Sequence, residues 1–154
     1  MATEDVWDSY RTAVVDLAPP GGAPFRIVPA EPGTAGAWPE GLTPPAFVIT
    51  AWNPDSVLLS PQENHARHAR LLAELGSRGL SWWPAVGRDP VSSHGEEGVL
   101  VSGIDEEEAL VIGRAHGQAA VFAWSPEAWQ VVSCTDGRRH ISGWRVVTGL
   151  DPYE

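Results

Sequence analysis

Lysine is absent from the 154-residue sequence, so all ten basic residues are arginines. A Schiff-base lysine, a P-loop lysine and a lysine general base are therefore excluded. Cysteine occurs once, at Cys134, which leaves no partner for an intrachain disulfide and no cysteine-based zinc cluster. These absences remove several mechanistic classes before any motif is considered.

Positive charge and long apolar runs are also scarce. The 20 acidic and 10 basic residues give a formal net charge of −10, which would repel a phosphate backbone, so we expect no nucleic-acid partner. No apolar run approaches the ~20 residues that span a membrane, and the N-terminal residues lack the basic and apolar regions of a signal peptide. We therefore expect a cytoplasmic protein that does not associate with membranes.

The length and the 43% hydrophobic content are typical of a single domain over residues 1–154. Apolar spacings of three and four predict an N-terminal helix over residues 4–17. Residues 29–45 hold five prolines and three glycines, which predicts a loop. Trp38 within this loop is expected to anchor it to the domain, with covering a pocket as the alternative.

From residue 46 onward, apolar patterns and turn signals predict the order strand, helix, strand, strand, helix, strand. The expected segments are 47–52, 61–75, 81–86, 96–101, 105–116 and 119–124. Ser60 and Glu63 form a capping box at the start of the first of these helices. Asp136-Gly137 then predicts a C-terminal hairpin of residues 128–134 and 140–147.

This order is that of the ferredoxin-like split βαβ fold. We therefore predict an α+β domain with a βαββαβ core over residues 46–125, a mainly antiparallel sheet and helices on one face. The N-terminal helix and the C-terminal hairpin are additions to that core. Most of the eight tryptophans fall in predicted strands and are expected to build the core.

Polar residues interrupt the apolar stripe of the predicted helix over residues 61–75. Asn64 and His68 precede Leu71 and Leu75 at spacings of four, three and four, and Arg67 lies beside them. The stripe carries these polar groups toward the sheet, where an unpaired buried polar group costs about 1–3 kcal/mol. A bound ligand or other residues must satisfy them. Candidates from other elements are Asn53, Glu96, Glu97 and Gln118.

His65 and His68 lie three residues apart, but this spacing alone does not indicate a metal site, and we predict neither a metal nor a cofactor. The sequence does not indicate an oligomeric state. Glu96 and Glu97 are neighbours on one predicted strand, so at most one of them points into any single pocket.

Four segments together resemble the bacterial family known as domain of unknown function 3293: Ile49–Pro54, Ser60–Arg67, Glu96-Glu97 and His116–Phe122. The resemblance covers about residues 46–125. In the family pattern a serine follows the acidic pair, where this chain has Gly98. The resemblance implies a bacterial protein and a shared polar set, but no activity. That set is Asn53, Glu63, Asn64, Arg67, Glu97 and Gln118.

Three functional hypotheses follow, and a purely structural role for Asn64 and Arg67 stays open beside them. The first is a small-ligand-binding domain whose polar pocket lies between strand 46–53 and helix 61–75 and recognises an anionic or amide group. Arg67 would hold the ligand there. The second is a small enzyme that uses Glu97 as acid or base in the same pocket. The third is an acidic interaction or regulatory protein with a basic partner. The ligand-binding residues expected for the first hypothesis are Asn53, Asn64, Arg67, His68 and Gln118.

Overall fold

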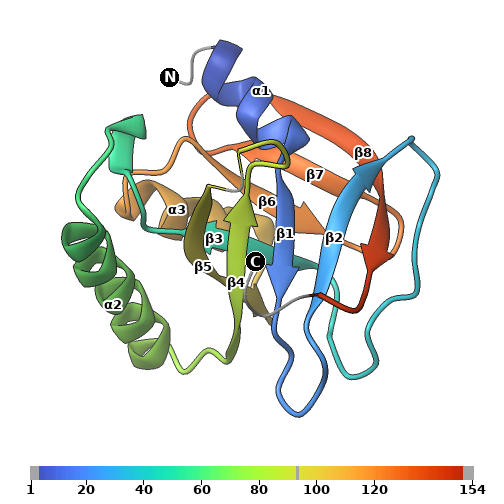
Figure 1. Ribbon diagram of the computed structural model, residues 1–154. Helices are drawn as coiled ribbons and strands as arrows, with labels where there is room; N and C mark the ends of the chain where they lie inside the picture. The colour runs from blue at the N-terminus through green and yellow to red at the C-terminus, as the bar shows by residue number, and fades with distance from the viewer. Residues whose placement is uncertain (1–3, 93, 151–154) are drawn as a thin grey trace.

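The structure is a computed structural model that describes residues 4–92 and 94–150. Over these residues, eight strands form a closed barrel that is accompanied by three α-helices (Figure 1). In chain order the elements are α1 (Glu4–Thr12), β1 (Val14–Leu17), β2 (Phe25–Ala30), β3 (Ala46–Thr50), the 3-10 turn η1 (Pro54–Ser56), α2 (Pro61–Ser77), β4 (Trp82–Arg88), β5 (Gly95–Ser102), α3 (Glu106–Ala115), β6 (Ala120–Trp124), β7 (Trp129–Ser133) and β8 (Arg139–Val147).

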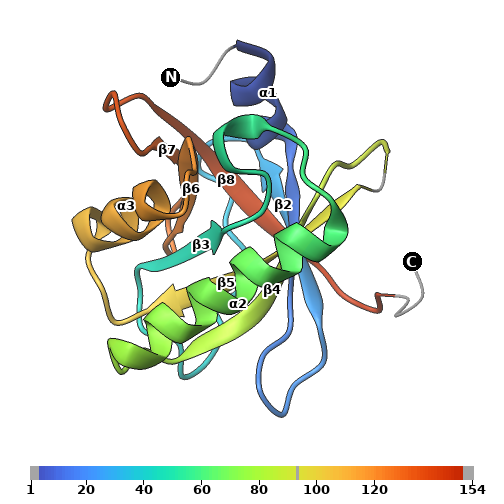
Figure 2. The same cartoon turned by 90° about the vertical axis from the view of Figure 1, so that its left-hand side faces the viewer.

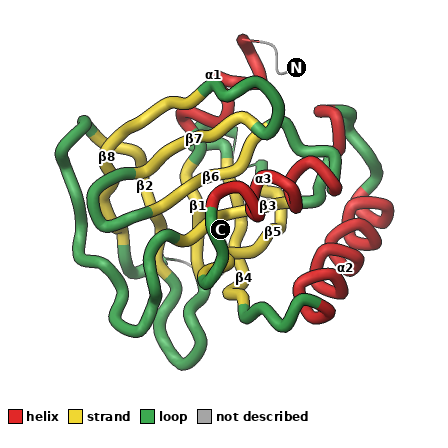
Figure 3. Tube along the Cα trace, turned by 180° about the vertical axis from the view of Figure 1, so that it is seen from behind, coloured by secondary structure: helices red, strands yellow, loops and turns green. Residues whose placement is uncertain are grey.

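The barrel closes in the order β1-β2-β8-β7-β6-β3-β5-β4, and β4 pairs back to β1. All neighbouring strands run antiparallel. Figure 3 shows the strands from behind, with α2 and α3 on the same side of the barrel. In Figure 2, α2 lies across the viewer's side of β4 and β5. None of the described helices is long and apolar enough to cross a membrane.

The predicted ferredoxin-like fold is wrong, because that fold is an open sheet with two edge strands and this sheet is closed. The strands of residues 46–125 lie in the order β6-β3-β5-β4, but neither outer strand is an edge. Strand β4 pairs with β1 and β6 pairs with β7, and the remaining strands complete the barrel. Closure satisfies the backbone groups that an open sheet would leave exposed on its edges.

The predicted N-terminal helix is also too long. It ends at Thr12, and Val14–Leu17 forms β1. The apolar residues of this short segment fit both the period of a helix and the alternation of a strand. In the structure they alternate as in a strand, with Val15 and Leu17 in the barrel core and Asp16 outside it. The C-terminal hairpin is confirmed, since β7 and β8 pair from Trp129 with Ser142 to Val132 with Arg139.

Side chains of the strands alternate between two cores. The first fills the barrel, and on β3 it includes Ala46 and Val48. The second lies outside the barrel under α2 and α3, where Phe47 and Ile49 of the same strand meet Leu71 of α2. The amphipathic helices therefore cover one outer wall of the barrel and leave its interior separate.

Trp38 closes the end of the barrel at which β6 finishes. The Trp38 ring centroid lies 4.3 Å from that of Trp124 and 6.3 Å from that of Trp144. Its indole Nε1 donates a 2.6 Å hydrogen bond to the carbonyl oxygen of Leu42, which fixes the loop between β2 and β3. The predicted anchoring role of Trp38 is thus confirmed.

Candidate functional site

A cavity of about 400 Å³ lies at the other end of the barrel. Ala120 and Phe122 at the start of β6 form part of its apolar lining, whereas Trp124 at the end of β6 contacts Trp38. Helix α1 contributes Tyr10, whose ring meets Phe122 edge-on at 5.9 Å between centroids. The cavity is therefore apolar toward the barrel core. Its polar lining includes Thr50, Asn53, His94, Glu96 and Gln118.

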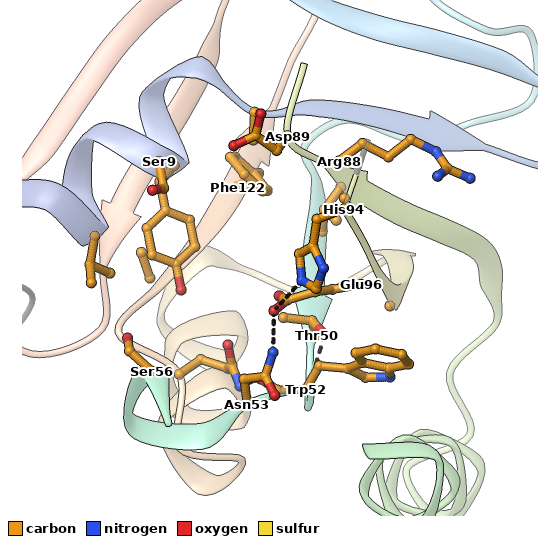
Figure 4. A pocket seen from close by; sticks show the side chains of 18 of the residues that line it. Ser9, Thr50, Trp52, Asn53, Ser56, Arg88, Asp89, His94, Glu96 and Phe122 are labelled. Atoms are coloured by element: carbon orange, nitrogen blue, oxygen red, sulfur yellow. Dashed lines mark hydrogen bonds and ion pairs between the residues drawn. The ribbon is translucent and has the colours of Figure 1, made fainter. Parts of the chain in front are cut away.

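Glu96 is the carboxylate on the inner face of β5. The strand alternation directs Glu96 and Gly98 to the cavity and Glu97 to the outside, toward α2. Figure 4 shows Glu96 between His94 and Asn53. Its Oε1 accepts a 2.6 Å hydrogen bond from Asn53 Nδ2, and His94 Nε2 lies 3.6 Å from the same oxygen.

Gly98 is explained by backbone proximity. A Cβ at this position would lie 2.6 Å from the carbonyl oxygen of Ile49, so a side chain would force β3 and β5 apart. A serine at this position, which the sequence resemblance implies, could not be placed on this backbone without such a shift.

The turn after β3 holds Asn53 in an unusual conformation. Asn53, Asp55 and Ser56 all have positive φ angles, of 48°, 56° and 61°. Asparagine tolerates this region better than most residues, but three such residues within four positions cost conformational energy. Contacts with other segments must therefore hold the turn in place.

Asn64 of α2 provides one of these contacts. It is only 2% exposed, and its Oδ1 accepts a 2.8 Å hydrogen bond from the backbone N–H of Asn53. Its Nδ2 donates to Asn53 Oδ1 at 2.9 Å. The polar interruption of the apolar stripe is thus explained by a direct bond to the turn that bears Asn53. The Ser60 cap that starts α2 is confirmed by a 3.1 Å bond from Glu63 N–H to Ser60 Oγ.

The turn before β6 provides the second contact. Asp55 N–H donates to the carbonyl oxygen of Gly117 at 2.8 Å. A Cβ at Gly117, whose φ is +73°, would lie 2.5 Å from Pro54 Cβ, so only glycine permits this approach. Gln118 follows, and its Nε2 donates to the carbonyl oxygens of Trp52 and His116 at 3.0 and 3.2 Å. The turn that bears Asn53 therefore contacts three other segments: α2, β5 and the turn before β6.

The structure brings together only part of the predicted site. Asn53 and Gln118 line the cavity, and Asn64 lies directly behind Asn53. Arg67 does not line the cavity, and its side chain forms no hydrogen bond or ion pair with the residues that the structure describes. The role of Arg67 in ligand binding therefore stays a prediction.

His68 and Glu97 lie outside the cavity, between α2 and the outer face of β5. Glu97 Oε1 is 2.9 Å from His65 Nδ1, and Glu97 Oε2 is 3.8 Å from His68 Nε2. Burial lowers the pKa of His68, although the charge of Glu97 acts in the opposite direction. Among the described residues no group of three or more His, Cys, Asp or Glu side chains could hold a metal ion.

Several cavity residues could not be predicted from the sequence. Tyr10 lies within the predicted N-terminal helix and His94 lies between two predicted strands, and neither was among the candidate residues. Glu96 was considered beside Glu97, but the sequence does not show which of two strand neighbours faces inward. The alternation of β5 carried a usable signal, since Glu96 and Gly98 have the same parity as Leu100 of the barrel core.

Fold and site together define a closed antiparallel β-barrel with a polar-rimmed cavity at one end. Residues 49–121 match the family model described as Protein of unknown function (DUF3293). The resemblance noted from sequence is therefore confirmed. The matched segment supplies α2, β4, β5 and α3, together with the end of β3 and the start of β6, whereas β1, β2, β7 and β8 lie outside it. Searches of curated proteins and of solved structures find no match to the chain.

Proposed function

We propose that the chain binds a small, partly apolar molecule in the open end of the barrel. The cavity of about 400 Å³ carries this proposal, because sites for small molecules generally have volumes of about 300–1,000 Å³. Its apolar lining and its few polar groups are also typical of such sites. An eight-stranded barrel has an interior wide enough for one small ligand.

The proposed site differs in position from the pocket expected between strand 46–53 and helix 61–75. Asn53 and Gln118 remain proposed ligand contacts, and Asn64 becomes a positioning residue that acts through Asn53. Recognition of an anionic group depended on Arg67, which lies outside the cavity, so we do not include it. The expected cytoplasmic location stays a prediction.

The two alternative functions gain no support from a specific contact. An enzyme that uses Glu97 would need this carboxylate in the cavity, but Glu97 contacts His65 on the outside of the barrel. For an interaction protein, no surface of the described residues shows a feature that selects a basic partner. Small-molecule binding is therefore the function that the geometry supports best.

A fragment titration followed by protein NMR tests the proposal. Binding fragments should shift the amide signals of Val48, Thr50 and Ala120, which line the cavity. Ala120→Leu should abolish these shifts because the added atoms occupy the cavity. Ala119→Leu is the matched control, since this neighbouring alanine does not line the cavity. Should Ala120→Leu fail to fold, Ala13→Leu at the less buried rim provides a second blocking variant.

The proposal would be rejected if fragments bind only outside the cavity. It would also be rejected if Ala120→Leu and Ala119→Leu both bind the fragments as tightly as the original protein does. Thermal unfolding of each variant shows whether it is folded at the temperature of the titration. A library with no binder at millimolar concentration would also count against it.

A further inference from the structure

We propose that the ligand of this cavity carries a positively charged amine, which binds beside Glu96 with an apolar body against Tyr10 and Phe122. This inference rests on the proposed small-molecule function and names the ligand class. It depends on how the protein orients the polar groups around Glu96.

The orientation of the two asparagine amides is fixed by backbone N–H groups. Leu59 N–H donates to Asn53 Oδ1 at 2.9 Å, and Asn53 N–H donates to Asn64 Oδ1 at 2.8 Å. A backbone N–H can only donate, so both Oδ1 atoms are acceptors and both amide nitrogens are donors. Asn53 Nδ2 therefore donates to Glu96, and Glu96 must accept.

This hydrogen bond engages only Oε1 of Glu96. No described residue donates to Oε2, so the carboxylate keeps acceptor capacity for a ligand. Gln118 has the same polarity, because its Nε2 donates to two carbonyl oxygens and no described residue donates to its amide oxygen. Gln118 is only 7% exposed and lines the cavity. Both groups thus offer acceptors to a molecule that supplies donors.

The permanent cation in the lining does not neutralise Glu96. Arg88 Nε donates to Asp16 Oδ2 at 2.8 Å on the outer face of the barrel. Figure 4 shows the Arg88 side chain extending away from Glu96. His94 lies 3.6 Å from Glu96 Oε1, but its ring is charged only when it is protonated. Asp89, the other carboxylate of the described lining, is exposed to solvent, and its Oδ1 accepts from the N–H groups of Val91 and Ser92.

The remaining lining selects the body of the ligand. Tyr10 and Phe122 provide aromatic surface, and Val48 and Ala120 provide aliphatic surface. Burial raises the pKa of Tyr10 far above its ordinary value, so its hydroxyl adds no second negative charge. A short aryl or alkyl group joined to an ammonium therefore matches both halves of the cavity.

The test compares three probes that share one body and differ in the polar group: 2-phenylethylamine, 2-phenylethanol and 3-phenylpropanoate. Dissociation constants are measured by NMR titration at about pH 8, where histidine side chains are generally neutral and an alkylammonium stays charged. The amine should bind at least about tenfold more tightly than the alcohol, and the carboxylate most weakly. Shifts should map to the cavity residues.

Glu96→Gln removes the charge but keeps an acceptor for Asn53. It should weaken amine binding by about 10- to 100-fold and leave alcohol binding unchanged, as expected for the loss of a charge-assisted hydrogen bond. Glu97→Gln is the matched control, because it makes the same chemical change one residue away on the outer face. It should leave all three dissociation constants within about twofold.

Equal binding of amine and alcohol in the cavity would overturn the amine preference but retain the small-molecule function. So would tighter binding of the carboxylate, or a loss of amine binding in Glu97→Gln that matches the loss in Glu96→Gln. If no probe binds at about 10 mM, the amine inference is overturned, and the fragment titration decides the proposed function separately. Should Glu96→Gln fail to fold, the order of the three probes with the unmodified protein still decides the inference.

Discussion

The two ends of the barrel are built from the same strands but have opposite characters. At one end Trp38, Trp124 and Trp144 pack together, and the latter two are fully buried. At the other end a cavity is rimmed by polar groups that include Asn53 and Glu96. The difference shows where the protein gains stability and where it keeps space.

The contrast runs along individual strands. On the inner face of β6, side-chain size increases from Ala120 through Phe122 to Trp124, from the open end to the filled end. On β5 the inner face changes from Glu96 and Gly98 to a buried leucine. Small and polar residues at one end and large aromatic residues at the other therefore set the depth of the cavity.

The largest expected effect breaks the filled end. Trp144→Ala removes a fully buried indole whose ring centroid lies 5.1 Å from that of Trp124. Replacement of a buried tryptophan by alanine costs about 3–5 kcal/mol, because it removes apolar contacts and leaves a void. Urea unfolding should therefore show a loss of about this size in the free energy of unfolding. Trp144→Phe, which keeps a ring, should lose less.

The cavity residues provide the contrast to this result. A Glu96→Gln variant should unfold at nearly the same urea concentration as the original protein, because its side chain is partly exposed and keeps an acceptor. If Trp144→Ala loses no more stability than Glu96→Gln, the division between a stabilising end and a binding end is wrong.

Local features of the fold could be predicted from the sequence. The Ser60 cap, the Asp136-Gly137 hairpin and the anchoring of Trp38 depend on short-range chemistry, and all three are found. Barrel closure was missed because it depends on pairs distant in sequence, such as Val15 with Gly87. No local pattern records such a pairing, and the alternation of a four-residue strand is too short to distinguish from a helical turn.

The candidate site was also only partly predictable, because contacts between distant segments leave no local pattern in the sequence. Asn53 and Asn64 interrupt apolar patterns, and their mutual hydrogen bonds explain the interruption. The cavity itself arises where α1, β3, β5 and β6 meet, and only the closed barrel brings them together. Arg67 lies beside the predicted stripe of Asn64 and His68, but it does not line the cavity. Successive side chains on a helix differ in direction by about 100°, so a residue next to the stripe can point away from the site.

The next largest effect concerns the open end. Asn64→Leu should lower the free energy of unfolding by about 2 kcal/mol, because it leaves the buried N–H of Asn53 without its acceptor. It should also weaken binding of 2-phenylethylamine, since Asn53 no longer holds Glu96 in one position. Urea unfolding and NMR titration measure the two effects.

Arg67→Ala serves as the control on the same helix. It removes no side-chain hydrogen bond or ion pair with the described residues, so it should change neither the stability nor the binding by much. Loss of binding in Arg67→Ala with unchanged stability would instead support the role that the sequence pattern predicted for this arginine. Retained binding in Asn64→Leu would show that the asparagine pair is structural only.

The smallest expected effect concerns the wall between the two ends. Asp16 of β1 accepts hydrogen bonds from Arg26 Nε at 2.6 Å and from Arg88 Nε at 2.8 Å, which join β1 to β2 and β4. Burial alone would raise the pKa of Asp16, but the hydrogen bonds and charges of the two arginines hold it below its ordinary value. Asp16→Asn should therefore lower the free energy of unfolding at pH 7 by about 1 kcal/mol.

The direction of the pH dependence follows from the lowered pKa. The ionised carboxylate stabilises the fold at all pH values above the unfolded pKa of about 3.9, and this contribution disappears as the pH falls through the lower folded value. Asp16→Asn should thus reduce the loss of stability below about pH 4. Arg26→Gln should lower stability at pH 7 while Asp16 still titrates and remains paired with Arg88. If the stability of Asp16→Asn runs parallel to that of the original protein through this acid range, the Asp16 carboxylate does not hold this wall of the barrel together.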